Sequence, residues 1–429
     1  MTEEYGNLHR EMRESYRPRV IDSMISDKLS VYGGVLITGP RSCGKSWTAL
    51  NMSKSAIFLG DKGSNRFAEL NPQIALEGER PRLIDEWQDV PNLWDVARRN
   101  IDLSGGKGMY IFTGSSLPPL ESTSHTGIGR IARMQMRTMS LFESGASSGA
   151  ASLRSLFESG GIPRSPSRMD YPEAVRLICR GGWPRALNLD DGEAVGMSYD
   201  YLESVTGLDL SRVDGKRRSQ TTAGLLLRSL ARNSASPASI PTIAGDIRDA
   251  GTDISAPTIR GYIDALKKLF VIEEQPAWHP SLRSRTRVRS SPKRHFTDPS
   301  LAAAALDAKP EILMRDTRTA GLLFESLCYR DLSVYASAIG GRVFHYRDDS
   351  GLEADAIVEL DDGRWGAAEV KLGPFEFDKA AANLVRLKEK MIAAGAAPPS
   401  FLAILSASGG AAHMRPDGIA EVPMDCLGP

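Results

Sequence analysis

One eight-residue segment constrains the fold of this chain more than any other feature. It consists of Gly39, Pro40, Arg41, Ser42, Cys43, Gly44, Lys45 and Ser46, which fit the pattern G-x-x-x-x-G-K-[ST] at every fixed position. The glycines allow the backbone to wrap around a phosphate chain. Lys45 can reach the outer phosphates, and the Ser46 hydroxyl can bind Mg²⁺. The segment therefore predicts a phosphate-binding loop whose ligands are ATP and Mg²⁺.

The sequence on both sides of this loop has the pattern that such a loop requires. Residues 32–38 read as a short buried strand, and residues 47–54 read as a helix. Strand, loop and helix in this order are the setting of the motif, and the helix N-terminus adds a positive dipole end near the phosphates. A chance match in a glycine-rich turn is the alternative, and the context argues against it.

Two later strand ends offer partners for the loop. The first is Asp85 followed by Glu86, at the end of an apolar run. We expect Asp85 beside Mg²⁺ and Glu86 beside the attacking water, although paired acids at a strand end are often only a solvated turn. The second is Thr113, after a strand over residues 108–112, whose hydroxyl could sense the outer phosphate or position water. An ordinary turn explains Thr113 equally well.

Composition limits the class of protein. A length of 429 residues predicts about two to four domains, and 53 basic residues balance 53 acidic ones. Any contact with nucleic acid therefore needs a local basic patch. No apolar run approaches a membrane span of ~18 residues, and the first residues are not expected to be a secretory signal. The scattered cysteines fit a reducing compartment, so we expect a cytoplasmic protein.

Periodicity divides the first half of the chain into an alternating part and a helical part. Alternating strand and helix patterns over residues 31–140 predict an α/β fold with a mostly parallel sheet. A segment rich in Ser, Gly and Ala follows at 144–152, and we interpret it as a flexible link. Helical patterns over residues 170–215 are interrupted by a Gly-Gly-Trp-Pro turn, whose Trp183 we expect to pack against a neighbouring helix.

Residues 219–276 have a pattern of their own. Helices are predicted over 222–233, 243–250 and 259–269, followed by a strand that begins at Phe270. Three short helices before a strand pair indicate a winged helix-turn-helix whose third helix contacts DNA, although winged helices also serve as spacers between proteins. The surface candidates for recognition are Thr258, Arg260, Lys267 and Lys268.

A basic run follows, with no acidic residue before Asp298. It contains Arg283, Arg285, Arg287, Arg289, Lys293 and Arg294. Because the first arginines alternate with other residues, an extended segment would place them on one side, where they could contact phosphate. A solvated charged face is the alternative. If DNA is a partner, the winged helix and the segment Arg283–Arg294 are where we expect it to bind.

The last part of the chain contains a second set of charged residues on predicted elements. Glu325 lies on a helix, Asp355 on a strand, and Glu369 and Lys371 lie two positions apart on the next strand. Carboxylates and a lysine at one sheet edge could bind Mg²⁺ and activate water for phosphodiester cleavage. This arrangement resembles the metal-dependent nuclease fold of type II restriction enzymes. An active nuclease, a nuclease-like fold without turnover and a surface ion pair remain alternatives, and we take nearby His345 as structural.

Seven motifs occur in order along nearly the whole chain. They are ITGPRSCGKS, LIDEWQ, FTGSS, GRIARMQMRTMSLFESG, GGWPRAL, FTDPSLAAA and AEVKLG. This order resembles the bacterial and archaeal AAA-type ATP-binding proteins that carry a C-terminal domain of unknown function. The resemblance implies an ATPase core, a helical lid, a winged helix and a nuclease-like C-terminal domain. It implies ATP binding and architecture rather than a biological process.

An AAA-type protein can offer an arginine to the nucleotide of a neighbouring subunit, where it stabilises charge on the transferred phosphate. Arg130 is the first candidate here and Arg133 the second, with an ordinary surface charge as the alternative. Asp85 follows Lys45 by only 40 residues (85 − 45), which indicates a compact core and argues against a hexamer. A homo-oligomer of another kind and a protein partner both remain open.

Together these patterns predict an α/β protein with a P-loop NTPase core. The expected segments are an N-terminal helical segment (1–30), the ATPase core (31–150), a helical lid (151–218), a winged helix (219–280) and a restriction-endonuclease-like α/β domain (281–429). We expect an ATPase that couples hydrolysis to conformational change, with DNA bound or processed by the C-terminal region. The alternatives are a non-catalytic nucleotide switch that binds a protein partner and an ATP-gated Mg²⁺-dependent nuclease.

Overall fold

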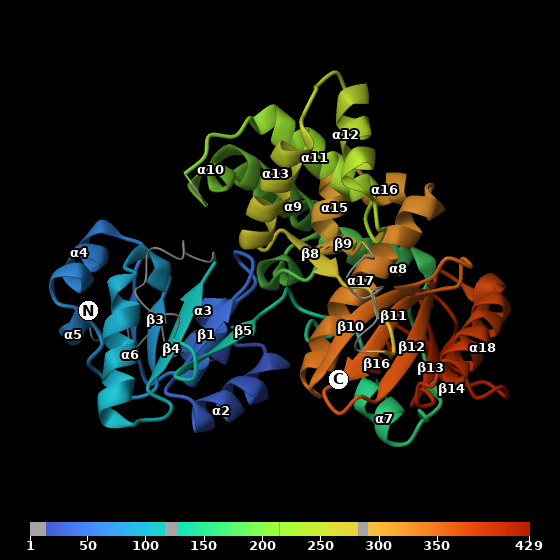
Figure 1. Cartoon of the computed structure of the whole chain (residues 1–429), viewed down its shortest axis with the longest axis horizontal. Helices are drawn as coiled ribbons and strands as arrows, with labels where there is room; N and C mark the ends of the chain where they lie inside the picture. Colours follow the sequence, from blue (N-terminus) through green and yellow to red (C-terminus); the bar gives the residue numbers. More distant parts are fainter. Residues whose placement is uncertain (1–13, 116–126, 214, 282–290) are drawn as a thin grey trace. The chain divides into compact units, whose positions relative to one another are not determined.

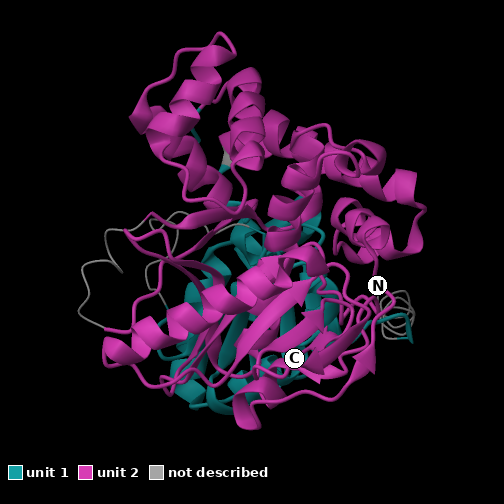
Figure 2. Ribbon diagram, turned by 90° about the vertical axis from the view of Figure 1, so that its right-hand side faces the viewer, with its two compact units in different colours: residues 1–138, 212–216, 268–270 teal, residues 139–211, 217–267, 271–429 magenta. Residues whose placement is uncertain are grey.

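The computed structural model describes residues 14–115, 127–213, 215–281 and 291–429. The chain divides into two compact units, which Figure 2 shows in different colours. Unit 1 comprises Met1–Thr138, Arg212–Lys216 and Lys268–Phe270. Unit 2 comprises Met139–Ser211, Arg217–Lys267 and Val271–Pro429.

Unit 1 is built on a parallel sheet with the strand order β2-β3-β4-β1-β5 (Figure 1). Its strands are β1 (Gly34–Thr38), β2 (Ser55–Phe58), β3 (Arg82–Asp85), β4 (Tyr110–Gly114) and β5 (Ile131–Gln135). Because the carboxyl ends of parallel strands meet at one edge, the residues that follow β1, β3 and β4 lie at the same edge of this sheet. The mostly parallel α/β core predicted from the sequence is confirmed.

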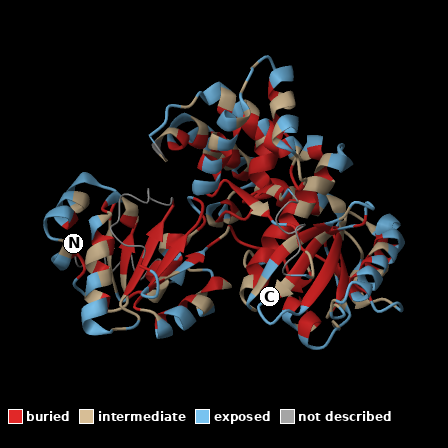
Figure 3. Ribbon diagram, in the orientation of Figure 1, coloured by how far each residue is buried: buried red, intermediate tan, exposed pale blue. Residues whose placement is uncertain are grey.

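The central strands β1 and β4 of unit 1 are buried at every position, because they carry largely apolar side chains on both faces. Val35 and Ile37 of β1 pack into one core with α2 (Ile21–Val31). Leu36 packs into the opposite core with α6 (Asn92–Ser104). Figure 3 shows these strands as buried, as expected of a parallel sheet covered by helices. Other helices of the unit are α3 (Lys45–Met52), α4 (Lys62–Leu70), α5 (Pro72–Ala75) and the 3-10 turn η1 (Trp87–Asp89).

Unit 2 contains a mixed sheet with the strand order β10-β11-β12-β13-β15-β14-β7 (Figure 1). Its strands are β7 (Ser165–Pro166), β10 (Gly341–Arg347), β11 (Glu353–Leu360), β12 (Trp365–Lys371), β13 (Leu402–Ser406), β14 (Ala411–Met414) and β15 (Ala420–Pro423). Strands β10, β11 and β12 are antiparallel neighbours, whereas β12, β13 and β15 are parallel. Helices α17 (Thr317–Ser337) and α18 (Phe377–Ala393) pack against this sheet. The C-terminal α/β sheet predicted from the sequence is confirmed.

Helices fill the middle of the sequence. They are α7 (Leu153–Glu158), α8 (Tyr171–Arg180), α9 (Asp191–Ser204), α10 (Leu210–Arg212), α11 (Gln220–Arg232), α12 (Ile240–Asp249), α13 (Ala256–Lys268), α15 (Pro299–Ala305), α16 (Pro310–Leu313), and the short turns η3 (Pro184–Asn188) and η4 (Val205–Asp209). Trp183 packs on Tyr201 of α9, with ring centroids 4.9 Å apart, so the expected helix packing of this Trp is confirmed. Within the described ranges, no helix is both long and apolar enough to cross a membrane.

The elements expected of the winged helix are present in the predicted order. Helices α11, α12 and α13 are followed by β8 (Ile272–Gln275), which pairs with antiparallel β9 (Lys293–Phe296). Helix α15 comes later in the sequence but packs against α8, α9 and α11. Its residues are almost entirely buried, because alanines at successive positions leave room for helices on several sides. The expected lid and winged helix therefore share packing with a segment beyond residue 280.

The interpretation of residues 144–152 as a flexible link is wrong. These residues belong to unit 2, where β6 (Ala151–Ser152) pairs with the C-terminal strand β16 (Leu427–Gly428). The Ser147 hydroxyl donates to the main-chain oxygen of Leu427 (2.6 Å). A Cβ on Gly428 would lie 2.8 Å from the backbone of Gly149, so small residues here permit close chain packing. The first segment of unit 1 accordingly ends at Thr138, earlier than the expected boundary at residue 150.

A buried ion triad holds several of the sequence motifs together inside unit 2. The guanidinium of Arg330 lies 3.0 Å from Asp298 and 2.7 Å from Asp331, and all three residues are at most 2% exposed. Asp298 also accepts the main-chain N–H of Gly182, and Asp331 accepts that of Leu141. Three buried charges are tolerated because each is paired and hydrogen-bonded. The triad thus gives three of the seven motifs a structural role.

Candidate functional site

The phosphate-binding loop of unit 1 connects β1 to α3. Its backbone adopts left-handed conformations at Ser42 (φ 59°) and Gly44 (φ 104°), directly before α3 begins. At Gly39 a Cβ atom would lie 2.1 Å from the main-chain oxygen of Met136, so only glycine fits at that position. The loop therefore curls tightly before the helix N-terminus, a geometry that favours phosphate.

Lys45 is held inside this loop. The residue is only 4% exposed, and its ammonium donates to the main-chain oxygens of Gly39 (3.0 Å) and Pro40 (2.7 Å). Both partners are neutral carbonyl groups. A phosphate oxygen would be a stronger, charged acceptor for the same ammonium. The lysine is therefore buried without being committed to a carboxylate.

The back of the loop is supported by the segment that precedes α2. Arg19 is 6% exposed and donates to the main-chain oxygens of Cys43 and Arg137, each at 2.9 Å. The Tyr16 hydroxyl lies 3.0 Å from the hydroxyl of Thr48 on α3. Sequence reasoning missed this support, because one arginine in a mixed-charge N-terminal segment has no recognisable spacing. Its role appears only when the chain folds back on the loop.

Asp85 ends β3 beside Thr113 of the neighbouring strand β4. The Thr113 hydroxyl donates to Asp85 Oδ1 and accepts the main-chain N–H of Glu86 (3.2 Å). Burial raises the pKa of Asp85, the Thr113 and Ser46 hydroxyls oppose this shift, and Glu86 adds to it. Thr113 is fully buried, and its hydroxyl contacts both Asp85 and the main chain of Glu86. A role of Thr113 toward the outer phosphate or toward water stays a prediction.

Glu86 has an unusual backbone and two side-chain partners. Its φ of 53° lies in the left-handed region, and the turn η1 follows immediately. The amide of Gln88 donates to Glu86 Oε2, and the Ser115 hydroxyl lies 3.3 Å from the same oxygen. A non-glycine residue at positive φ often marks a functional position. Sequence reasoning did not find the hydrogen bond from Gln88 to Glu86, because no motif in the chain pairs these two residues.

The donor set at this edge fits ATP and Mg²⁺. The Ser46 hydroxyl is hydrogen-bonded to the Asp85 carboxylate, and the positive charge of Lys45 is close enough to act on the same carboxylate. A hydroxyl and a carboxylate are the protein ligands that Mg²⁺ takes at a triphosphate. Lys45, Ser46 and Asp85 therefore lie together, and Glu86 follows Asp85 directly in the sequence.

The two arginines considered as fingers lie at the edge strand of the sheet. Arg130 occupies the turn before β5, and its Nε lies 2.7 Å from Asp102 of α6. The Arg130 side chain is 50% exposed. Arg133 lies on β5 itself and is also exposed. Neither residue is on a helix, and a role toward a second subunit stays a prediction.

The structure also brings together the four charged residues predicted in unit 2, and it adds Lys293. Glu325 lies on α17, Asp355 on β11, Glu369 and Lys371 on β12, and Lys293 on β9. Lys293 Nζ lies 2.5 Å from Glu325 and 3.5 Å from Asp355. Lys371 Nζ lies 3.6 Å from Asp355 and 2.7 Å from Glu369. The charges alternate in sign from Glu325 to Glu369, and we call these five residues the charged chain.

The three carboxyl groups of the charged chain differ in the direction of their pKa shifts. Burial raises the pKa of Glu325 to about 8 and that of Glu369 to about 7, with a further contribution from Asp355. For Asp355, burial alone would raise the pKa, but Lys293 and Lys371 outweigh burial and lower it. The central carboxylate is therefore ionised near neutral pH, while the outer two carboxyls hold protons more readily.

The expectation that Lys293 and Arg294 belong to a solvent-facing basic segment is wrong. Lys293 is 6% exposed and pairs with carboxylates, and Arg294 donates to the main-chain oxygen of Ala238 (2.7 Å). The reason is strand pairing, because β9 joins β8 and becomes part of the packed structure of unit 2. The other residues of the basic run, Arg283, Arg285, Arg287 and Arg289, lie outside the described residues.

His345 lies on β10 and is 2% exposed. Burial and the nearby Lys293 ammonium lower the pKa of His345 to about 4, so its ring is neutral at physiological pH. In the part of the chain that the structure describes, no three His, Cys, Asp or Glu side chains form a group that could hold a metal ion. The arrangement in unit 2 thus differs from a ready metal site.

The residues considered for DNA recognition all lie on α13 and are exposed. They are Thr258, Arg260, Lys267 and Lys268. Lys267 is already paired with Glu274 of β8 at 2.5 Å. Exposure of basic residues on one helix is compatible with phosphate contact and equally with a solvated face, so DNA binding stays a prediction.

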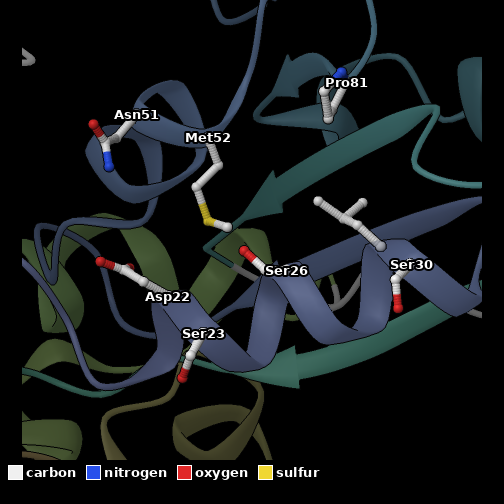
Figure 4. A pocket seen from close by; sticks show the side chains of 8 residues that line it. Asp22, Ser23, Ser26, Ser30, Asn51, Met52 and Pro81 are labelled. Carbon is white, nitrogen blue, oxygen red and sulfur yellow. The ribbon is translucent and has the colours of Figure 1, made fainter.

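A surface hollow of about 660 Å³ lies beside α2 and the end of α3 (Figure 4). Its lining residues are Asp22, Ser23, Ser26, Leu29, Ser30, Asn51, Met52 and Pro81. None of the predicted site residues is among them. The hollow is therefore separate from the residues that fit ATP.

Three sequence families match successive parts of the chain. Residues 32–144 match an AAA domain, residues 172–312 match a domain of unknown function (DUF8612), and residues 320–419 match another domain of unknown function (DUF4143). The first match contains the sheet of unit 1 and the phosphate-binding loop. The second begins at α8 and ends in α16, and so spans the expected boundaries at residues 218 and 280.

The chain is also similar to individual proteins. Uncharacterized proteins of Mycobacterium bovis and Mycobacterium tuberculosis are each 24% identical over 343 residues, which is 79% of this chain and 70% of theirs. Similar solved structures include a Walker-type ATPase of Pyrococcus abyssi (18% identity, TM-score 0.41, 68% of this chain and 97% of that one). Others are the replication initiator DnaA bound to AMPPCP and single-stranded DNA (12%, 0.29, 59% and 91%) and the Thermotoga maritima RuvB Holliday junction branch migration motor (16%, 0.25, 61% and 93%).

Proposed function

We propose that the chain is an AAA-type ATP-binding protein with a C-terminal domain of unknown function, and that it hydrolyses ATP to drive a conformational change. The observation that carries this proposal is the arrangement of Lys45, Asp85 and Glu86 at the carboxyl edge of a parallel sheet. Ligands of open α/β sheets bind at this edge, where strand ends and helix N-termini meet. The match to an AAA domain over residues 32–144 supports the same conclusion.

Binding of the triphosphate depends on the loop and on Lys45. The loop N–H groups and the N-terminus of α3 attract the phosphate oxygens. Lys45 exchanges its carbonyl acceptors on Gly39 and Pro40 for charged oxygens, which are stronger acceptors. Ser46 and Asp85 are the residues that would hold Mg²⁺, which supplies positive charge against the phosphate oxygens.

Hydrolysis depends on Glu86. Its carboxylate accepts hydrogen bonds from Gln88 and lies within reach of Ser115, and these contacts fix its position next to the Mg²⁺-binding edge. A carboxylate at this place can accept a proton from a water that attacks the outer phosphate. Thr113 keeps the acids in register, since its hydroxyl contacts both Asp85 and the main chain of Glu86.

Glu86 also separates this proposal from its alternative. A nucleotide switch that only binds a protein partner has no need of a carboxylate placed for water. In the proposed function, unit 1 turns over ATP while DNA binds elsewhere on the chain. Arg260 and Lys268 of α13 are exposed basic residues that such a contact with DNA would use.

The test is ATP turnover and ATP binding of the wild type and Glu86→Gln. We expect turnover to fall about 100-fold or more while the Kd for ATP stays within a few-fold of the wild type, because only the water-activating group is removed. Glu69→Gln is a matched control, since Glu69 is an exposed residue on α4. If both wild type and Glu86→Gln bind ATP and turn over equally slowly, the chain is a switch.

A further inference from the structure

The charged chain of unit 2 places an ammonium group between two of the carboxylates that the sequence offered as metal ligands. Lys293 Nζ lies between the carboxylates of Glu325 and Asp355, at 2.5 Å and 3.5 Å. The Lys293 side chain is 8% exposed, and those of its two partners are 14% and 13% exposed. A divalent cation and an ammonium group compete for the same carboxylate oxygens, so only one can occupy this position.

The carboxylate oxygens of Asp355 and Glu369 in the charged chain are not free to bind a divalent cation either. Asp355 Oδ2 accepts the main-chain N–H of Val370 (2.8 Å) and lies 3.6 Å from the second ammonium, that of Lys371. Glu369 is bonded to Lys371 (2.7 Å) and to the amide of Asn383 (2.5 Å). Both carboxylate oxygens of Asp355 and both of Glu369 therefore already have a hydrogen-bond donor or a cation beside them, and two positive charges oppose a third.

Lys293 is fixed in place by the strand that carries it. On β8, the Gln275 amide donates to the main-chain oxygens of Asp355 (2.8 Å) and Phe344 (2.9 Å). On β9, the ring of His295 lies 3.0 Å from Gln275 Oε1 and 3.0 Å from the hydroxyl of Ser326 on α17. The paired strands β8 and β9 are thus bonded to the same elements that carry Asp355 and Glu325. These contacts hold the backbone of Lys293 beside the two carboxylates.

We propose that the Lys293 ammonium permanently takes the place of the divalent cation, so that the charged chain of unit 2 binds no metal and cleaves no phosphodiester. The site is a latent metal site, closed by a residue of the same chain. Its role is to join β9 to α17 and β11 through the hydrogen bonds that the Lys293 ammonium donates to Glu325 and Asp355. This inference does not depend on ATP hydrolysis in unit 1, and either can fail without the other.

The test is binding of Mn²⁺ to the nucleotide-free full-length protein, measured by titration calorimetry with and without Asp355→Asn. We expect the wild type and Asp355→Asn to bind Mn²⁺ equally, because the charged chain of the wild type binds none. In Lys293→Met, loss of the ammonium should expose Glu325 and Asp355, and Mn²⁺ should bind at least about tenfold tighter than to the wild type. The double variant Lys293→Met/Asp355→Asn should lose this gain. Lys390→Gln removes an exposed lysine of unit 2 and should change nothing.

Two results would overturn the proposal. One is Mn²⁺ binding to the wild type that disappears in Asp355→Asn, because the metal would then bind beside Lys293. The other is a folded Lys293→Met that gains no site. If Lys293→Met does not fold, the wild type still tests the proposal. Cleavage of a plasmid by the wild type with Mg²⁺ or Mn²⁺ would contradict it if Asp355→Asn abolishes that cleavage.

Discussion

The two units each place lysine beside carboxylates at strand ends, but their lysines have different partners. In unit 1, Lys45 donates only to neutral loop carbonyls in the contacts described, at 2.7 and 3.0 Å. In unit 2, Lys293 and Lys371 contact carboxylates directly. In a low-dielectric interior, an ion pair is much harder to separate than a hydrogen bond to a carbonyl. The hydrogen-bond partner of each lysine therefore determines whether its ammonium group can move to a phosphate oxygen.

The carboxylates of the two units differ in the same way. Asp85 contacts hydroxyl groups of Thr113 and Ser46, which are neutral and compatible with a bound cation. Asp355 has two ammonium neighbours and is already compensated. Similar residue types at similar strand positions thus support a ligand site in one unit and an internal ion network in the other. Residue type alone does not distinguish the two.

The largest expected effect is the loss of ATP binding in Lys45→Ala. Removing the ammonium should raise the Kd for ATP by about 100-fold, or roughly 3 kcal/mol, because a charged hydrogen bond to phosphate is lost. Lys371→Ala is the counterpart in unit 2 and should leave the Kd for ATP unchanged. Titration with a fluorescent ATP analogue measures both. Equal loss of binding in the two variants would abolish the distinction between the units.

A smaller effect is expected in the pH dependence of stability. Burial raises the pKa of Glu325 from 4.5 to about 8, so the folded state holds a proton that the unfolded state has lost between these values. Stability from this group is present below pH ~4.5 and is lost as pH rises toward 8. Between pH 5 and 8, we expect the free energy of unfolding of the wild type to fall by about 1–3 kcal/mol more than that of Glu325→Gln.

Urea unfolding at several pH values, monitored in unit 2 by Trp278 or Trp365 fluorescence, measures this difference in slope. Glu389→Gln is the matched control, because Glu389 is an exposed residue of α18. It should keep the wild-type slope. If the free energy of unfolding depends on pH in the same way for the wild type and Glu325→Gln, Glu325 is ionised in the folded protein. The Lys293 ammonium would then lie between two carboxylates that are both charged.

Local patterns were sufficient to predict most of the secondary structure and the residues that gather beside the loop after β1. The roles proposed for the loop residues, Asp85 and Glu86 depend on chemistry at fixed spacing, and period-two alternation placed Glu369 and Lys371 on one face of β12. Such patterns depend only on neighbours in sequence. The sequence therefore predicted which residues gather at the two sheet edges, although it left the activity of the second edge open.

Contacts between distant segments were not predictable in this way. Lys293 appeared as one member of a basic run, and only its pairing through β9 shows that it is buried against Glu325, 32 residues away. Arg19 reaches Arg137 across 118 residues, and Ser147 reaches Leu427 across 280. A single sequence contains no signal for such pairs, because each partner has a plausible role on the surface or in a loop. Of these contacts, the one between Lys293 and Glu325 is the basis of the closed metal site that we propose.

The smallest effect on stability is expected for Arg130→Ala. The Arg130–Asp102 pair is short at 2.7 Å, but the arginine side chain is half exposed, so the pair contributes at most about 1 kcal/mol to the free energy of unfolding. Urea unfolding checks this value, with Arg66→Ala, a change at an exposed arginine of α4, as the control. Turnover tests the separate prediction of a finger. A turnover defect of Arg130→Ala that appears only at high protein concentration, with the Kd for ATP unchanged, would mean that this arginine acts on the nucleotide of a second copy. Equal turnover of wild type and Arg130→Ala at every concentration would leave Arg130 as the surface charge that its ion pair indicates.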